Sequence, residues 1–232
     1  HQFTAEAIAT RGLEVLSEVG KLCNYNIQCL HGVGHGALAY LGYDIASVQK
    51  ASEACAQLPA HDLFSGCEGG VFMEYDLRSM LPDGKPRILH PGDDALAPCN
   101  VLAPRESGTC YYWQVHIWKA SWLSSSTPAA FFMRAGALCN TLKEMDSRFC
   151  FAGIGAAAVS VAEYDPAMLA SLCGMASGLP ISQALCRASG GKALSGAVSE
   201  TAGDYACKGL PSAAESACIR YIHTPSTPAS FE

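Results

Sequence analysis

Twelve cysteines fall into six successive pairs along the chain of 232 residues, and this pattern constrains the fold more than any other feature. In most pairs the two cysteines are separated by ten to twelve residues. The pairs are Cys23 and Cys29, Cys55 and Cys67, Cys99 and Cys110, Cys139 and Cys150, Cys173 and Cys186, and Cys207 and Cys218. Self-similarity at a period of about 20 to 50 residues is typical of repeat architectures. The spacing therefore predicts a repeated supersecondary unit with its own disulfide bond.

Helix-capping signals around the cysteines indicate that the repeated unit is a pair of antiparallel helices. Thr127-Pro128 and Asp165-Pro166 each place a capping oxygen before a proline at the first helical position. Asp44 can cap a further helix, and Gly42 can end the helix before it. First helices are expected near 4–24, 44–58, 95–103, 127–144, 165–177 and 201–208, and their partners near 28–42, 63–81, 106–124, 147–163, 180–195 and 211–223.

The spacing of the units predicts the architecture. Measured between second cysteines, the units are 38, 43, 40, 36 and 32 residues long, which is in the range of helical-hairpin repeats. We therefore expect an all-α fold, a right-handed α-solenoid of six disulfide-stapled antiparallel helical hairpins. One array should cover residues 1–223, with a loop rich in proline and glycine inserted at about 76–107 and an extended tail over 224–232.

Composition and charge limit the compartment and the partners. The net charge is −6, and no run of Lys or Arg offers attraction to phosphate, so nucleic acid is not expected as a partner. The longest weakly polar stretch, residues 151–162, is shorter than the roughly 20 residues of a membrane-spanning helix, and no transmembrane segment is predicted. Paired cysteines without Cys-x-x-Cys spacing fit disulfides formed in an oxidising compartment. An extracellular, cell-surface or periplasmic location follows.

Paired cysteines that bracket the turn between two helices, with glycine soon after the second cysteine, resemble the cysteine-rich Sel-like repeat proteins that some bacteria export. Those proteins are relatives of tetratricopeptide arrays. The fragment Tyr40-Leu41-Gly42-Tyr43 is similar to part of the family's Leu-Gly-x-x-Tyr-x-x-Gly core, whereas the gap between paired cysteines is longer here. The resemblance implies the architecture and the general role of such arrays, which is binding, and it implies no particular functional residue.

The strongest local motif is Cys29-Leu-His31-Gly-Val-Gly-His35-Gly. Two histidines four residues apart on a helix share a face and can chelate one Zn²⁺ or Cu²⁺ ion. The motif lacks the glutamate of His-Glu-x-x-His, which argues against a zinc protease. In the alternative interpretation, both histidines line a polar inner surface or form hydrogen bonds to a neighbouring helix.

Alignment of the units on their second cysteines extends this motif. At about 100° per residue, His31 and His35 face away from the stapled helix, and later units place Met73 and His116 at the position of His35. Because packed helices lie about 8–10 Å apart, His31, His35 and Met73 can share an ion, whereas His116 is two units away from His35. Thioether sulfur suits copper better than zinc. Met73 as an ordinary core residue, and Glu74 as an alternative ligand, stay open.

Two other groups of residues are candidates. Glu68 and Glu74 lie in a mostly apolar segment, so a carboxylate there needs a partner, and the histidines of the preceding unit can supply it. A solvated Glu68 with a structural Glu74 is the alternative. An aromatic stretch can stack on a sugar or bind a peptide, unless half of it is buried in the core. The candidate binding residues in that stretch are Tyr112, Trp113, Gln114 and His116.

The sequence therefore predicts an exported binding or structural module with a protein or peptide partner, or one that assembles with copies of itself. The rival hypothesis is a protein that binds copper or zinc, with a binding or redox role, centred on His31 and His35. The sequence has no Ser/His/Asp constellation, no phosphate-binding glycine loop after a strand and no haem-attachment motif. No catalytic residue is assigned, and a non-enzymatic role is favoured.

Overall fold

The computed structural model describes residues 2–24, 26–58, 66–224 and 227–231. Within these ranges the chain forms twelve α-helices and four short 3₁₀ helices, and no β-strand. The prediction of an all-α fold is confirmed. The helices group into two compact units, residues 1–113 and 114–232, which are described separately. The single array over residues 1–223 stays a prediction.

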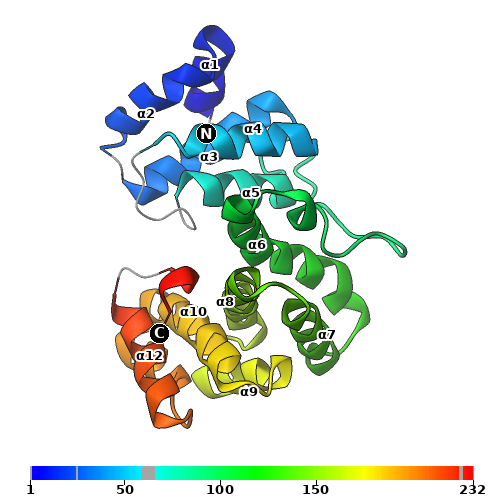
Figure 1. Cartoon of the computed structure of the whole chain (residues 1–232), viewed down its shortest axis with the longest axis vertical. Helices are drawn as coiled ribbons and strands as arrows, with labels where there is room; N and C mark the ends of the chain where they lie inside the picture. Colours follow the sequence, from blue (N-terminus) through cyan, green and yellow to red (C-terminus); the bar gives the residue numbers. More distant parts are fainter. Residues whose placement is uncertain (1, 25, 59–65, 225–226, 232) are drawn as a thin grey trace. The chain divides into compact units, whose positions relative to one another are not determined.

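Unit 1 is built around α3, which packs against α1, α4 and α5 (Figure 1). Its helices are α1 (Gln2–Arg11), η1 (Leu13–Val15), α2 (Leu16–Leu22), α3 (Ile27–Leu41), α4 (Ile45–Cys55), α5 (Cys67–Leu77), η2 (Cys99–Val101) and the first part of α6 (Pro104–Trp122). The core between α3, α4 and α5 is apolar and includes Leu30, Leu38, Val48 and Phe72. Burial of these side chains is the main favourable contribution to the folding of this unit.

Unit 2 is built around α10, which packs against α8, α9, α11 and α12 (Figure 1). Its helices are η3 (Leu123–Ser125), α7 (Pro128–Asn140), α8 (Glu144–Val161), α9 (Pro166–Ala176), α10 (Pro180–Ala197), α11 (Glu200–Ala206), α12 (Ser212–His223) and η4 (Pro228–Ser230). Aromatic and aliphatic side chains fill its core, among them Phe131, Phe132, Phe151 and Ile154.

The helix starts that local chemistry predicts are present. Thr127, Asp165 and Asp44 each accept a hydrogen bond from the backbone amide three residues later. These caps satisfy amides at a helix start that have no partner within the helix. Gly42 ends α3 with a φ of 108°, a backbone conformation that favours glycine.

Two expected helices differ from the prediction. The helix expected over 4–24 is interrupted at Gly12, where φ is 77°, so that α1 is followed by η1 and α2. The helix expected over 95–103 forms only the 3₁₀ turn η2, between Pro98 and Pro104. Proline lacks the amide that a helix interior needs, which accounts for the short turn. Of the helix expected over 63–81, α5 is present, and residues 63–65 lie outside the described residues.

In the stretches expected to form an inserted loop and an extended tail, the described residues include the 3₁₀ turns η2 and η4. Between α5 and α6, residues 78–103 contain one 3₁₀ turn and no α-helix. Of the tail over 224–232, residues 225–226 and 232 are not described, and residues 227–231 carry η4, which packs on α8. Phe231 is buried beside Tyr221, and Arg148 donates a hydrogen bond to the Phe231 carbonyl oxygen. The buried side chain of Phe231 thus attaches residues 227–231 to the rest of unit 2.

All twelve cysteines are bonded, in the six pairs that the spacing predicts. The Cα atoms of bonded cysteines lie 5.4 to 5.9 Å apart. Five bonds join the C-terminal end of one α-helix to the next α-helix, and the Cys99–Cys110 bond joins η2 to α6. Six disulfides indicate a chain that folds in an oxidising compartment. None of the described helices combines the length and the apolar character that a membrane span requires.

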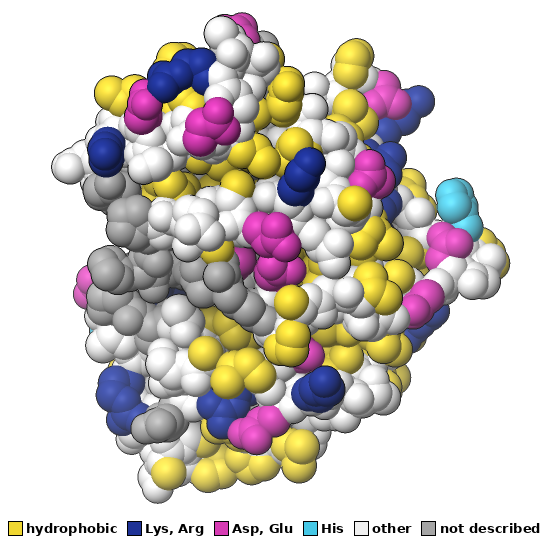
Figure 2. All heavy atoms as spheres, turned by 45° about the horizontal axis from the view of Figure 1, so that its top comes forward, with side chains coloured by type: hydrophobic (Ala, Val, Ile, Leu, Met, Phe, Trp, Pro, Cys, Tyr) yellow, Lys and Arg dark blue, Asp and Glu magenta, His cyan; other side chains and the backbone are white. Residues whose placement is uncertain are grey.

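The surface in view carries charges of both signs. In Figure 2, Lys and Arg side chains lie interspersed with Asp and Glu, with hydrophobic side chains between them. This arrangement agrees with the modest net charge of −6.

Candidate functional site

The crossing of α3 and α5 in unit 1 brings the histidine motif next to Met73 and Glu74. Two glycines make the close approach: a Cβ atom on Gly34 would overlap the carbonyl oxygen of Cys67, and one on Gly70 would overlap the carbonyl oxygen of His31. Glycine at these two positions lets the two backbones touch. Side chains near these glycines on the two helices are therefore held close together.

His31 and Met73 meet at this crossing. His31 Nε2 lies 3.2 Å from Met73 Sδ, and the ring centroids of His31 and His35 are 5.0 Å apart. His31 and Met73 are half-buried, whereas His35 is only 3% exposed. Of the three residues that the sequence predicts as ligands, His31 therefore lies beside both of the others.

His35 is held by a buried carboxylate. Its Nδ1 lies 2.8 Å from Glu74 Oε2, and the Glu74 side chain is fully buried. An ionised carboxylate can only accept, so Nδ1 carries the hydrogen and donates it. In a neutral ring the lone pair is then on Nε2, the atom that binds a metal. The expectation that a histidine of the preceding helical hairpin partners Glu74 is confirmed.

Three further donors complete what we call the Glu74 cluster. Tyr43 Oη donates to Glu74 Oε1 at 2.6 Å, and the Met80 amide donates to the same oxygen at 2.9 Å. Ser79 Oγ donates to Glu74 Oε2 at 2.5 Å. With His35, these groups give each carboxylate oxygen two donors. The Glu74 cluster consists of Glu74, His35, Tyr43, Ser79 and the Met80 amide.

The cluster fixes the charge of Glu74. Burial by itself raises the pKa of this carboxyl group, but the hydrogen bonds outweigh burial and lower the pKa to about 2. Burial, together with the hydrogen bond to the Glu74 carboxylate, raises the pKa of Tyr43. At neutral pH the cluster therefore contains one carboxylate and a neutral tyrosine. Because all four donors point at the Glu74 carboxylate, this carboxylate is suited to orient His35 rather than to bind an ion itself.

The sequence did not predict Tyr43, Ser79 or the Met80 amide as parts of this site. Ser79 and Met80 reach Glu74 because Arg78, at the end of α5, adopts a left-handed conformation with φ 51° and ψ 38°. This conformation turns the chain back over the last turn of the helix. No pattern of residue types signals such a turn at an arginine, since glycine and asparagine are the usual residues there.

Glu68, the second acidic residue of this segment, is 1% exposed. The alternative interpretation of a solvated Glu68 is therefore wrong. It lies in the first turn of α5, which packs on both α3 and α4.

The aromatic stretch of α6 is divided between the units. Trp113 belongs to unit 1, where its ring centroid lies 5.9 Å from that of His31 and 5.4 Å from that of Tyr112. Gln114 and His116 belong to unit 2, and Gln114 is only 1% exposed. Burial, and next the charge of Lys119, lower the pKa of His116 to about 4. His116 is therefore neutral at physiological pH.

A further buried acid of α5, Asp76, lies two residues after Glu74. Asp76 is 3% exposed, and its Oδ1 lies 3.8 Å from Arg87 Nε in the inserted loop. Burial raises the pKa of Asp76 to about 7, against the opposing charges of Arg87 and Arg78. Arg87 also donates to the hydroxyl of Tyr75 and to the carbonyl oxygen of Ala97. These contacts attach the inserted loop to α5.

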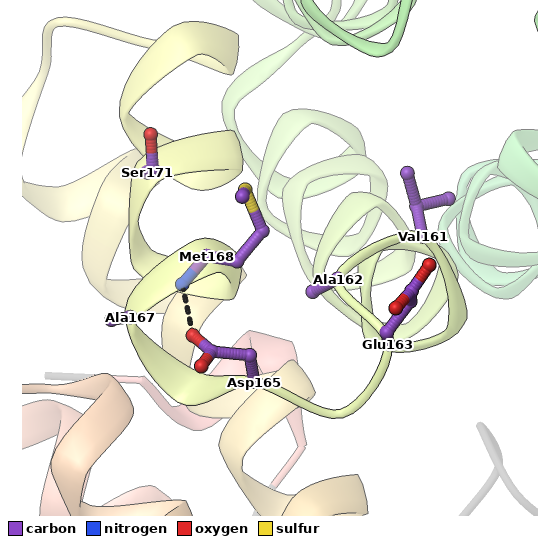
Figure 3. A pocket seen from close by; sticks show the side chains of 7 residues that line it. All are labelled: Val161, Ala162, Glu163, Asp165, Ala167, Met168 and Ser171. Atoms are coloured by element: carbon purple, nitrogen blue, oxygen red, sulfur yellow. Dashed lines mark hydrogen bonds between the residues drawn. The ribbon is translucent and has the colours of Figure 1, made fainter.

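A hollow of about 670 Å³ in unit 2 lies at the turn between α8 and α9. Figure 3 shows its lining, in which Asp165 turns its carboxylate back to the amide of Met168 to cap α9. The remaining lining residues are Val161, Ala162, Glu163, Ala167 and Ser171. Polar groups do not converge here as they do in a ligand site.

Comparisons with protein-family models, with curated proteins and with solved structures gave no match. Among the described residues, no group of three or more His, Cys, Asp or Glu side chains is placed to hold a metal ion. His31, His35 and Met73 at the α3–α5 crossing differ from such groups, because the third donor there is the thioether of Met73.

Proposed function

We propose that this chain is a metal-binding protein of an oxidising compartment, and that His31, His35 and Met73 hold the ion. The observation that carries the proposal is the 3.2 Å separation of His31 Nε2 and Met73 Sδ, beside a second histidine. Bonds of about 2.0–2.1 Å to nitrogen and 2.3 Å to sulfur place two ligands of one ion roughly 3.2–3.6 Å apart. The two atoms are thus spaced as two ligands of one metal ion.

The Glu74 cluster supports the same function. Histidines that bind metals usually donate their second ring nitrogen to a carboxylate or a carbonyl group, which fixes the tautomer and the ring orientation. His35 and Glu74 have this relation. Burial of a carboxylate between packed helices costs free energy, which the four donors must offset. Buried polar groups that depart from an apolar core in this way concentrate at functional sites.

Metal retention by the intact protein tests the proposal. Purified protein is incubated with copper or zinc ions, desalted, and analysed for metal per chain. We expect roughly one ion per chain, and a loss of most of it in His35→Ala, because removal of one of three ligands breaks the site. His90→Ala is the matched control, since His90 is an exposed histidine of the inserted loop. Metal content that is negligible, or equal in all three proteins, would contradict the proposal.

We further propose that the two units are parts of one right-handed α-solenoid of disulfide-stapled hairpins, as the resemblance to Sel-like repeats implies. A shared register supports this. Gly34 lies five residues after Cys29, and a Cβ on it would overlap the carbonyl oxygen of Cys67, the next second cysteine. Gly155 lies five residues after Cys150 and has the same relation to Cys186. Equivalent crossings in both units are what a repeat predicts.

A second candidate function is binding of a protein or peptide, or self-assembly of the secreted chain. Apolar side chains on α9 and the start of α10 favour it, because several are about half exposed. They are Met168 at 50%, Met175 at 42%, Leu179 at 57% and Ile181 at 46%. Light scattering over a range of concentrations tests self-assembly. A mass that rises with concentration and falls back in Leu179→Glu supports it, and a constant monomer mass counts against it.

A further inference from the structure

We propose that the ion held by His31, His35 and Met73 is monovalent copper, Cu(I). This inference rests on the proposed function, that these three side chains bind a transition-metal ion. It adds the identity and oxidation state of the ion and assigns Glu74 as a positioning residue for His35.

The donor set carries the first step. Two imidazole nitrogens and one thioether sulfur are all uncharged, and thioether sulfur is a soft ligand that selects Cu(I). Structural zinc sites use cysteine, histidine and carboxylate ligands, and Cu(II) favours nitrogen and oxygen in square-planar geometry. The contact between His31 Nε2 and Met73 Sδ brings nitrogen and sulfur to a separation at which both could bind one ion. This combination fits Cu(I) better than either divalent ion.

Charge and burial carry the second step. His35 is 3% exposed and the Glu74 side chain is fully buried, so the inner side of the site is out of water. The cost of burying an ion rises steeply with its charge, and a nearby opposite charge offsets it. Glu74 accepts hydrogen bonds from four donors, as an ionised carboxylate does, and so supplies one negative charge next to His35. The single negative charge of one carboxylate, next to uncharged ligands, balances the charge of a monovalent ion. It would balance only half of the charge of a divalent ion.

The role of Glu74 is positional. Its two oxygens accept from four groups, which keeps the carboxylate out of the coordination sphere and holds the His35 ring by Nδ1. Loss of such a carboxylate typically weakens metal binding by about 10–100-fold. A role in folding alone would instead change stability and leave the affinity for Cu(I) unchanged.

Trp113 provides a readout within the same unit. Its ring lies 5.9 Å from the ring of His31, so an ion at His31 and Met73 is expected to quench its fluorescence. All cysteines of the chain are in disulfides, so thiolates do not compete for copper in the oxidised protein. Copper bound to the intact chain therefore reports on histidine and methionine ligands.

The test is an anaerobic titration of the full, oxidised chain with Cu(I) supplied as its acetonitrile complex. Bathocuproine disulfonate competes for Cu(I), and Ag(I) and Zn(II) are titrated in parallel. We expect one Cu(I) per chain and a loss of affinity of more than about tenfold in Met73→Leu, which preserves side-chain volume. Met133→Leu is the control, because Met133 is 55% exposed in unit 2. Glu74→Gln should weaken Cu(I) by about 10–100-fold.

The outcomes separate this inference from the proposed function. Zn(II) bound more tightly than Cu(I), or Cu(I) affinity unchanged in Met73→Leu, would overturn the assignment of Cu(I) and leave metal binding standing. Absence of binding by all three ions would overturn both. A Glu74→Gln protein with a lower thermal midpoint but wild-type Cu(I) affinity would remove the positioning role.

Discussion

At the scale of single residues, two acids of α5 occupy opposite electrostatic states. Glu74 has four donors, and its pKa is lowered to about 2. Asp76, two residues further on, faces the charges of Arg87 and Arg78. These charges do not offset the effect of burial, and the pKa of Asp76 is raised to about 7. The difference arises from hydrogen bonds, because both side chains are removed from water. One acid is thus fixed in its charged form, while the other changes charge near neutral pH.

Asp76 predicts a dependence of stability on pH. Its folded-state pKa of about 7 lies above the ordinary value of 3.8, so the folded chain holds the proton more tightly than the unfolded chain. This contribution is present below pH 3.8 and is lost as the pH rises through about 7. The free energy of unfolding of the native chain should therefore fall relative to that of Asp76→Asn, by at most about 1.4 kcal/mol per pH unit in this window.

Urea unfolding at a series of pH values measures this difference. Glu74 is present in both proteins, so its opposite effect at low pH cancels in the comparison. Arg87 and Arg78, whose charges face Asp76, are likewise present in both proteins. Parallel stability curves between pH 4 and pH 7 would show that Asp76 does not titrate in this way.

At the scale of helices, the approach of α3 to α5 decides whether the site exists. Gly34→Ala places a methyl group against the backbone of Cys67 and 2.8 Å from the amide nitrogen of Val71. We expect a loss of about 1–3 kcal/mol in the free energy of unfolding, because neither backbone can yield locally. Metal retention should fall as well, since the helices that carry His31 and Met73 are pushed apart.

The control for this change is Gly174→Ala in α9. A Cβ at Gly174 meets no atom within 4 Å, so the substitution should stabilise the helix by roughly 0.5–1 kcal/mol. Guanidinium unfolding of both variants gives the comparison. If Gly34→Ala is as stable as Gly174→Ala, the two helices do not pack as closely as described.

The same elements show what a sequence can predict here. Caps at Thr127 and Asp165 depend on neighbouring residues only, so their positions were predicted correctly. The cysteine register predicts that His31, His35 and Met73 face one another, and the structure places His31 beside both Met73 and His35. Their role as metal ligands stays a prediction. The break at Gly12 falls on a residue type that adopts a positive φ readily, whereas the left-handed turn falls at Arg78, a residue type that rarely adopts it. Ser79 could not be assigned to the site without that turn.

At the scale of the whole molecule, disulfide bonds supply part of the stability that a larger protein gains from its hydrophobic core. Each unit contains three of them, closing sequence separations of 6 to 13 residues. In the entropic model each loop of this size contributes about 2–3 kcal/mol. The fold therefore depends on the redox state of its surroundings, which connects the stability of the chain to an oxidising compartment.

Removal of single bonds should reveal how this stabilisation is distributed. Cys139 and Cys150 are fully buried, so replacement of both by alanine loses the loop constraint and leaves a cavity, at a total of about 3–5 kcal/mol. The Cys23–Cys29 bond closes a shorter loop, and Cys29 is exposed, so its removal should lower stability by only about 2 kcal/mol. Calorimetry of the two double variants compares their unfolding midpoints. A midpoint lowered more by loss of Cys23–Cys29 would mean that the buried bond is not the stronger constraint, and that stability depends instead on the α2–α3 junction beside the histidine motif.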